Sequence, residues 1–300
     1  MVDKIKILKE TGRVSSEALS YAKTVIKEGV GLLEAVEKIE LFITQKGYDL
    51  SFPINISINE NAAHYTPNIT DKTVFNKNDL VKVDLGARRD DMLSDCAITI
   101  DLSAENAKIV ETANSALEEA INIVKAGRKV CEIGAAIEKT ILKNGFKPIM
   151  NLGGHGIEGE ELHTGAFIPN FDNGDDTELE EGDIISIEPF VTNGFGYVDE
   201  TAEVQIFQLI GTPSPRSSDT RRILDLIKTK YLTYPFSLRW IARSIPELSE
   251  FKIRRGIADL IQLNALEQFP VLVERKKGVV AQAEKELIVE KDSCTVLTTL

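Results

Sequence analysis

Apolar residues recur at helical spacing early in the chain, at Leu32, Leu33, Val36, Ile39 and Ile43. Side chains three or four residues apart share one face of a helix, so this pattern predicts a helix that buries one face in a core. Aligned without gaps at an offset of 98, residues 18–47 match residues 116–145 at ten of 30 positions. Both copies predict a helix, a glycine-containing break, a second helix and a closing glycine. The pattern therefore indicates an internal duplication.

A predicted strand that leads to a carboxylate follows each helix pair. Residues 78–84 read Asn-Asp-Leu-Val-Lys-Val-Asp, and residues 182–188 read Gly-Asp-Ile-Ile-Ser-Ile-Glu. Both begin with turn-forming residues and continue with apolar or β-branched ones. Asp84 and Glu188 thus hold equivalent places. If the halves pack about a pseudo-twofold axis, the two carboxylates meet at its centre.

The rest of the pattern predicts strands at 93–101, 197–208 and 279–290, with a different kind of segment before the last. Residues 212–222 are rich in Pro, Ser, Thr and Arg, which is typical of a linker, and residues 218–268 have helical patterns. Nothing in the first half corresponds to them. We therefore expect a catalytic domain in two parts, residues 1–210 and 269–300, with a helical insertion at 211–268.

Composition narrows the classes of function. With 300 residues and 43% hydrophobic content the chain can bury a large core. Its net charge of -12 argues against nucleic acid as a partner. Three cysteines without a CxxC pair indicate a reducing compartment. The charged N-terminus and the lack of an 18-residue apolar run predict neither a signal peptide nor a membrane span, so we expect a cytoplasmic protein.

The candidate chemistry lies in four carboxylates and three histidines. Asp84, Asp95, Glu188 and Glu284 each lie in or beside a segment that should be buried. Buried carboxylates are costly to ionise unless a cation compensates them. His64, His155 and His163 are the only histidines, and each lies in a Gly-, Asn- or Pro-rich stretch. Taken singly, each carboxylate is better explained as an ordinary strand residue or salt-bridge partner. Together with His155 they form an oxygen and nitrogen set suited to a pair of divalent metal ions.

Five stretches, in order and spacing, resemble the type II methionine aminopeptidases. They are Phe-Pro with Asn-Ala-Ala-His-Tyr-Thr-Pro-Asn (52–53 and 61–68), Val-Asp-Leu-Gly-Ala (83–87), Gly-His-Gly (154–156), Ile-Glu-Pro (187–189) and Ala-Gln-Ala-Glu (281–284). The resemblance covers nearly the whole chain. It implies the α/β pita-bread fold, with two pseudo-symmetric halves around a central antiparallel sheet, and the type II helical insertion.

Carried over residue by residue, the resemblance implies metal ligands at Asp84, Asp95, His155, Glu188 and Glu284. Two divalent ions (Co, Mn, Fe or Zn) would bind there, with Asp95 and Glu284 shared between them. His64 and His163 would contact the substrate, and Phe52, His64 and Phe269 would line the pocket for the methionine side chain. For the two phenylalanines, plain core packing stays open as an alternative.

The expected reaction is removal of the initiator methionine from peptides and nascent proteins that have a small second residue. A hydroxide between the metals would attack the scissile carbonyl, with Glu188 as proton shuttle and His64 or His163 as donor to the oxyanion. The family suggests a monomer. Ribosome association is a possible partner relation, although the chain lacks the long charged N-terminal extension of some members.

One departure from the family and two rival functions accompany this prediction. Cys96 stands where the family often has Thr; as the strand neighbour of Asp95 it should face the other way and is not expected to be a ligand. A proline-specific aminopeptidase or prolidase of the same fold would share all five ligands. A non-catalytic binding protein with this fold would typically have lost some of them.

Overall fold

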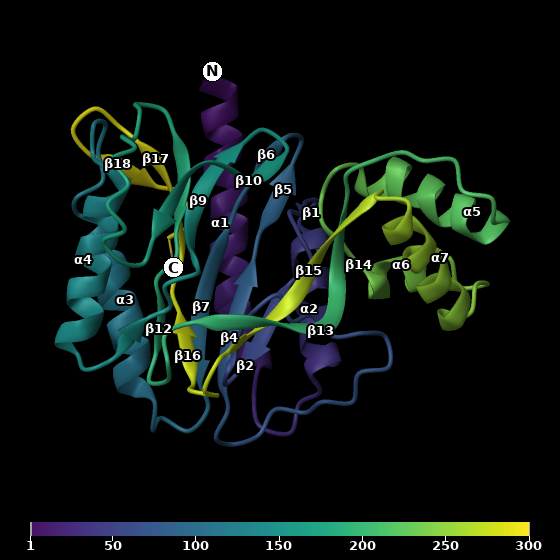
Figure 1. Ribbon diagram of the computed structural model, residues 1–300, viewed down its shortest axis with the longest axis horizontal. Coiled ribbons are helices and arrows are strands. Elements are labelled where there is room, and N and C mark those ends of the chain that lie inside the picture. The colour runs from purple at the N-terminus through teal and green to yellow at the C-terminus, as the bar shows by residue number, and fades with distance from the viewer. Residues whose placement is uncertain (1, 300) are drawn as a thin grey trace.

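The computed structural model describes residues 2–299 and contains two halves of the same design (Figure 1). The first half has helices α1 (Val2–Val25) and α2 (Leu32–Gln45). They cover an antiparallel sheet in the order β2 (Asn55–Ile58), β4 (Leu80–Leu85) and β7 (Cys96–Asp101). One hydrophobic cluster joins the helices to the sheet. The strands alternate only weakly in polarity because the sheet is covered on both faces.

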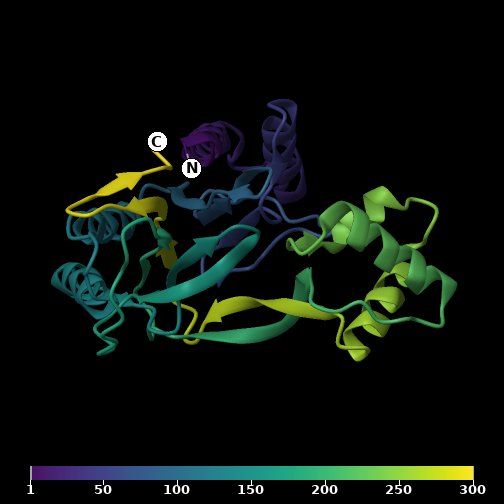
Figure 2. The same cartoon turned by 90° about the horizontal axis from the view of Figure 1, so that it is seen from above.

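The second half repeats this arrangement with helices α3 (Ala107–Ile121) and α4 (Val130–Lys143). Its sheet has the order β10 (Glu161–Pro169), β9 (Gly153–Glu158), β11 (Ile184–Ile187), β17 (Lys285–Val289) and β18 (Cys294–Val296). A second hydrophobic cluster lies between these helices and strands. Seen from above, α1 and α2 lie at the top of the view and α3 and α4 at its left edge (Figure 2).

The duplication extends to single hydrogen bonds. Gly29 and Gly127 have φ of 80° and 75°, and Gly47 and Gly145 have φ of 80° and 85°. The amide of Gly29 donates to the Phe75 carbonyl at 2.8 Å, and that of Gly127 donates to the Leu179 carbonyl at 2.8 Å. The repeat predicted from the sequence is confirmed. Its offset is 98 residues over the helices and grows to 104 at the strands, because the second connection is longer.

Three further antiparallel sheets complete the scaffold. Their strands are β1 (Asp49–Leu50), β5 (Ala87–Arg89) and β6 (Met92–Leu93); β16 (Val280–Gln282), β12 (Phe190–Thr192) and β8 (Lys147–Pro148); and β14 (Phe236–Ser237), β13 (Val198–Leu209), β15 (Leu266–Glu274) and β3 (Asn61–Ala63). The long pair β13 and β15 runs from the double-sheet body toward a separate group of helices (Figure 1).

That group of helices lies between β13 and β15 in the chain. It consists of α5 (Ser218–Leu226), the π-helical turn η1 (Ile227–Tyr231), α6 (Leu238–Ser244) and α7 (Glu250–Gln262). Serine N-caps at 217, 237 and 249 accept backbone hydrogen bonds and begin the three α-helices. The helices pack around their own hydrophobic cluster. The strand after them begins at Leu266, slightly before the predicted boundary at 269.

Two predicted strands are interrupted, and both breaks carry a candidate ligand. The strand predicted at 93–101 is divided into β6 and β7, with Ser94 and Asp95 between them. The strand predicted at 279–290 is divided into β16 and β17, with Ala283 and Glu284 between them. The breaks turn these two carboxylates away from regular pairing.

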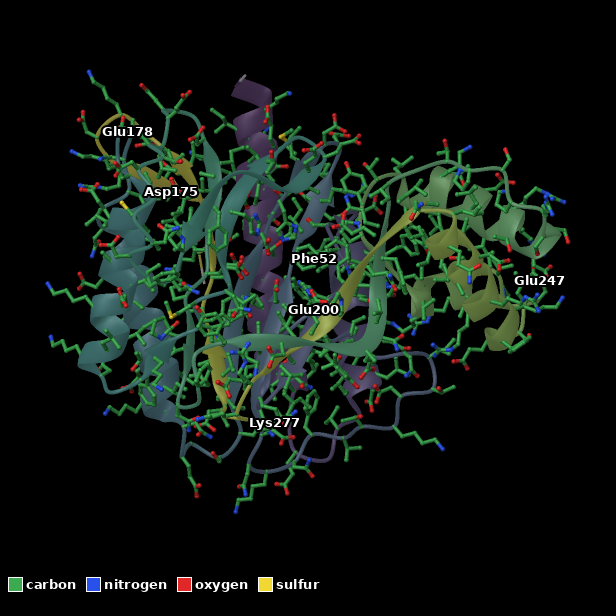
Figure 3. All side chains as sticks on the ribbon, viewed as in Figure 1. Phe52, Asp175, Glu178, Glu200, Glu247 and Lys277 are labelled. Carbon is green, nitrogen blue, oxygen red and sulfur yellow. The ribbon has the colours of Figure 1, made fainter. Side chains whose placement is uncertain are left out.

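Phe52 lies among the strands in the middle of the molecule, whereas Glu178 and Glu247 lie at opposite ends (Figure 3). Within residues 2–299 no helix is both long and apolar enough to cross a membrane.

Candidate metal centre

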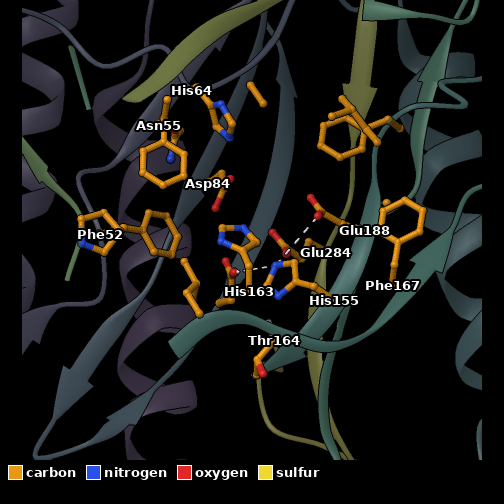
Figure 4. Close-up of a pocket in the computed structure, with 18 of the residues that line it drawn as sticks. Phe52, Asn55, His64, Asp84, His155, His163, Thr164, Phe167, Glu188 and Glu284 are labelled. Carbon is orange, nitrogen blue, oxygen red and sulfur yellow. Dashed lines mark ion pairs between the residues drawn. The ribbon is translucent and has the colours of Figure 1, made fainter. Parts of the chain in front are cut away.

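A cavity of about 530 Å³ opens between the two halves (Figure 4). Its lining includes every site residue predicted from the sequence: Phe52, His64, Asp84, Asp95, His155, His163, Glu188, Phe269 and Glu284. They come from segments spread over more than 200 residues of the chain. The fold therefore brings the whole candidate set to one place.

The four carboxylates reach the cavity from the two central sheets. Asp84 lies inside β4, and Glu188 directly follows β11, the equivalent strand of the second half. Asp95 directly precedes β7, and Glu284 directly precedes β17. The amide of Glu284 donates to the Ala97 carbonyl at 3.0 Å, which joins the sheet of one half to that of the other. The junction between the halves thus fixes where the carboxylates converge.

His155 lies closest to this convergence. It is on β9, opposite Ser186 of β11, and is buried. Its Nε2 lies 3.5 Å from Asp95 Oδ2 and 4.0 Å from Glu188 Oε1. One ligand atom each from Asp95, His155 and Glu284 lie within 4.8 Å of one another. That grouping is compact enough for a single cation to be shared.

Burial makes these carboxylates poor acids. It raises the pKa of Asp95 to about 8 and raises the pKa of Asp84, Glu188 and Glu284 well above the ordinary value. Beyond burial, the charge of Asp95 raises the pKa of Asp84 and of Glu284 further. Like charges in a buried site oppose ionisation unless positive charge balances them.

Several carboxylate oxygens here also lack a hydrogen-bond donor. Asp84 Oδ1, Asp95 Oδ1 and Glu284 Oε2 are buried without a partner. Native structures rarely leave such atoms unsatisfied, and each one calls for an explanation. Oxygen ligands of this kind, with one imidazole, match the donors that divalent transition metals accept. The residues therefore fit a metal site.

Burial keeps all three histidines neutral. It lowers the pKa of His64 and of His155 to about 4 and that of His163 to about 3. Neutral imidazole is the form that binds metals or donates a hydrogen bond from one nitrogen. The rings of His155 and His163 lie 4.3 Å apart.

His64 faces the same cavity from the opposite side. It follows β3 with φ of 63°, an unusual conformation for a residue with a side chain. Its Nδ1 lies 3.2 Å from the Pro270 carbonyl, and its ring packs edge-on against Phe269 at 5.7 Å. Phe52 lines the cavity nearby and is 5% exposed. His64, Phe52 and Phe269 give this side an apolar wall with one polar nitrogen.

The sequence did not indicate two residues that orient the carboxylates. The Gln282 amide donates to Glu188 at 3.2 Å, and the Ser186 hydroxyl donates to Glu284 at 2.6 Å. A signal for Ser186 was available, since residues two apart on a strand share a face and Ser186 stands two before Glu188. Gln282 lay within a motif already singled out for its glutamate.

Cys96 lies apart from the cavity. Its thiol donates to the Leu85 carbonyl at 3.5 Å, and it packs in the hydrophobic cluster of the first half. Burial raises the pKa of the thiol, which keeps it protonated. This position agrees with the expectation that Cys96 and Asp95 face opposite ways.

Comparison with known proteins identifies the family. The profile of metallopeptidase family M24 matches residues 6–211. A methionine aminopeptidase of Pyrococcus horikoshii is 42% identical over 290 residues, which cover 96% of this chain and 97% of that protein. One of Archaeoglobus fulgidus is 40% identical, with 96% of each chain covered.

Solved structures share the fold at lower identity. A thermophilic Arx1 superposes with a TM-score of 0.84 at 17% identity, covering 99% of this chain and 91% of the other. A methionine aminopeptidase of Rickettsia prowazekii superposes with a TM-score of 0.71 at 19% identity, covering 100% and 98%. The expected pita-bread fold is confirmed. The chain belongs to metallopeptidase family M24 and, within it, to the methionine aminopeptidases.

Proposed function

We propose that this chain removes the N-terminal methionine of peptides and nascent proteins by hydrolysis at the cavity between its halves. The observation that carries the proposal is the convergence of four buried carboxylates and one buried histidine on a cavity with an apolar wall. A purely structural cluster would leave these carboxylates either paired or replaced by apolar residues.

Asp84, Asp95, His155, Glu188 and Glu284 would hold two divalent cations, with Asp95 and Glu284 shared. The support is their donor chemistry, the unsatisfied oxygens and the close grouping of Asp95, His155 and Glu284. When bound, such ions act as Lewis acids and lower the pKa of water toward neutrality. The ion could be Co, Mn, Fe or Zn, since sites of this kind accept several.

The rest of the site would bind and orient the peptide. Phe52 and Phe269 would contact the methionine side chain, together with Ile206, which also lines the cavity. An unbranched thioether fills such an apolar pocket well. The carboxylates lie beside this wall, so the N-terminal amine and the scissile carbonyl of the same residue would lie next to the residues that hold the metals.

Proton transfer and charge stabilisation would fall to Glu188 and the two outer histidines. Glu188 would take a proton and pass it to the leaving amine, a role suited to a carboxyl group whose pKa lies above its usual range. His163, which is neutral, would donate a hydrogen bond to the oxygen that becomes negative in the transition state. The one N–H of neutral His64 is directed at the Pro270 carbonyl, so its Nε2 would instead accept a hydrogen bond from the substrate, such as that of the scissile amide.

The proposal extends to domain organisation and partners. Residues 1–210 and 269–300 would form the catalytic domain, and residues 211–268 an insertion subdomain with its own hydrophobic cluster. The working unit would be a monomer in the cytoplasm that acts on nascent chains, with ribosome association as a possible further relation.

Turnover of Met-Ala-Ser and of an Xaa-Pro dipeptide, each against a panel of divalent metals, tests the function. We expect cleavage of the methionine peptide, with Glu188→Gln as the inactive control. Cleavage of the Xaa-Pro peptide alone would favour the prolidase alternative. Failure of the purified chain to bind any divalent metal would favour a non-catalytic role.

A further inference from the structure

Among the contacts between the insertion and the catalytic body, one is made by a buried arginine. Arg239 lies in the first turn of α6 and is 1% exposed. A buried guanidinium is costly unless its donors are satisfied by well-placed acceptors. The partners of Arg239 therefore indicate what this charge stabilises.

Two of those partners belong to the segment that carries His64. Arg239 Nη1 donates to the Pro67 carbonyl at 2.6 Å and to Thr66 Oγ1 at 3.3 Å. Thr66 is itself fully buried. These contacts fix the backbone two and three residues after His64, where the chain leaves its left-handed turn.

The third partner anchors the arginine to the first half. Arg239 Nη2 donates to Glu40 of α2, and Trp240 Nε1 donates to the same carboxylate oxygen at 2.9 Å. Glu40 is 7% exposed, so this ion pair is largely shielded from water. Arg239 is thus held from α2 while it holds the segment of Thr66 and Pro67.

His64 is fixed on its other side by β15. The Pro270 carbonyl lies 3.2 Å from its Nδ1, and Phe269 packs against its ring. Without a second restraint, a residue at φ of 63° would gain by relaxing toward an ordinary backbone conformation. Next to His64, the Ile56 amide donates to the Tyr65 carbonyl at 2.7 Å, and the arginine adds a restraint beyond it, at Thr66 and Pro67.

We propose that Arg239 is a positioning residue for His64, so that the insertion helps to aim a substrate-facing group. Arg239 does not line the cavity and touches no reacting atom. This inference rests on the proposed role of His64 in the function above. Its geometric part, that Arg239 sets the position of the imidazole, can be tested without turnover.

Histidine NMR provides that test, because the chain has only three histidines. In protein with ¹⁵N-labelled histidine, His64→Asn assigns one ring. For Arg239→Met we expect the His64 resonances to shift in metal-free and Zn-loaded protein, with those of His155 and His163 unchanged. Arg239→Lys, which keeps one donor, should give an intermediate shift.

Arg243→Met is the matched control. Arg243 lies on the same helix and also pairs with Glu40, at 3.6 Å, but it has no contact with Thr66 or Pro67. We expect the spectrum and turnover of this variant to match the wild type. Thr66→Val removes one acceptor only and gives a second test if Arg239→Met fails to fold; its His64 shift should be smaller.

Kinetics distinguish positioning from general damage. A small misplacement of a catalytic group can cost about 100-fold. We therefore expect kcat on Met-Ala-Ser to fall by up to about 100-fold in Arg239→Met while KM changes little. Equal shifts of all three histidines, or none in folded Arg239→Met, would overturn the proposal. If the wild type cleaves no methionine peptide, the proposed function fails while the NMR result still decides the role of Arg239.

Discussion

In the first half a cavity carboxylate comes from Asp84, inside β4. In the second half its counterpart comes from Glu188, the residue directly after β11. The backbones around them repeat bond for bond, from the glycines after the first helix of each pair to the strands. The side chains do not repeat, because the second carboxylate is one methylene longer; in addition, β11 ends just before Glu188 whereas β4 continues past Asp84. The duplication therefore determines the shared backbone arrangement of the halves, whereas differences at single positions determine which side chains reach the cavity.

The two outer histidines differ in the same way. His64 is held by a bond to the Pro270 carbonyl and by a left-handed backbone turn, while His163 lies on β10 with its ring against that of His155. One is positioned by distant segments and the other by its neighbours in the sheet. The comparison teaches that equivalent sides of the cavity are built by different means.

The largest expected difference between the halves concerns proton transfer. Glu188→Gln should lower kcat on Met-Ala-Ser by about 100- to 10,000-fold, because it removes the proposed proton shuttle. Added metal should not restore the rate. Asp84→Asn should act through metal affinity instead, so that turnover recovers as Mn or Co concentration rises. Equal recovery of both variants would show that the two carboxylates have the same role.

The next difference concerns the histidines. His163→Ala should retain metal and lose about 100- to 1,000-fold in kcat, the usual cost of one oxyanion donor. His64→Ala should also retain metal and lower kcat by about 100-fold, because the substrate loses the acceptor that positions it. The measurements are metal content of the purified variants and steady-state kinetics. Wild-type turnover in either variant would show that its histidine takes no part in the reaction.

A smaller effect follows from the acidity of the shared carboxylates. The pKa of Asp95 is raised to about 8 in the folded, metal-free protein, so the stability this group contributes is present at low pH and lost as pH rises toward 8. Metal must displace the proton below pH 8. Metal-induced stabilisation should therefore grow by about 1 kcal/mol, roughly 2–4 °C in Tm, from pH 7 to pH 8.5.

The histidines do not affect this measurement between pH 7 and pH 8.5. Because their pKa values are lowered, the stability they contribute is complete above pH 6.5 and is lost only as pH falls toward 4. Thermal melts with and without Mn at both pH values make the measurement. Asp95→Asn is the control and should reduce the pH dependence, because one of the groups that must lose its proton to bind metal is then absent. Glu284→Gln tests whether the shared carboxylate of the second half behaves alike.

The smallest expected effect tests the symmetry itself. Gly29→Ala and Gly127→Ala place a methyl group in open space at φ of 80° and 75°, so only the left-handed backbone opposes them. Each should lower the free energy of unfolding by about 1 kcal/mol, and by the same amount. Urea denaturation measures both. A clear difference between the two would show that the halves are not equally supported by their surroundings.

The sequence predicted the parts of this structure that depend on local pattern. The helix pairs follow from apolar spacing and from Gly29, Gly47, Gly127 and Gly145, whose left-handed conformation favours glycine. The equivalence of Asp84 and Glu188 follows from the repeat. Their assignment as ligands came from the resemblance to a family, since a carboxylate after an apolar strand is in itself ordinary.

The remaining features depend on contacts between distant segments. Ser186 and Glu284 are 98 residues apart, and Arg239 and Pro67 are 172 apart. Arg239 stands between apolar residues in a helical pattern, where the pattern alone cannot distinguish a buried arginine from an exposed one. Likewise, the strands break at Asp95 and Glu284 because two sheets join there. The sequence of a single strand does not indicate such a junction.

The duplicated frame has a consequence for how this site could arise and be redesigned. Each half supplies only two of the four carboxylates, so neither half could complete the set alone. In a symmetric dimer of identical halves every substitution would appear twice, so the two sides of the cavity would have to carry the same residues. A single continuous chain removes that constraint. It allows the second half to have a longer acid and a helical arm while the first half keeps a histidine in a left-handed backbone conformation.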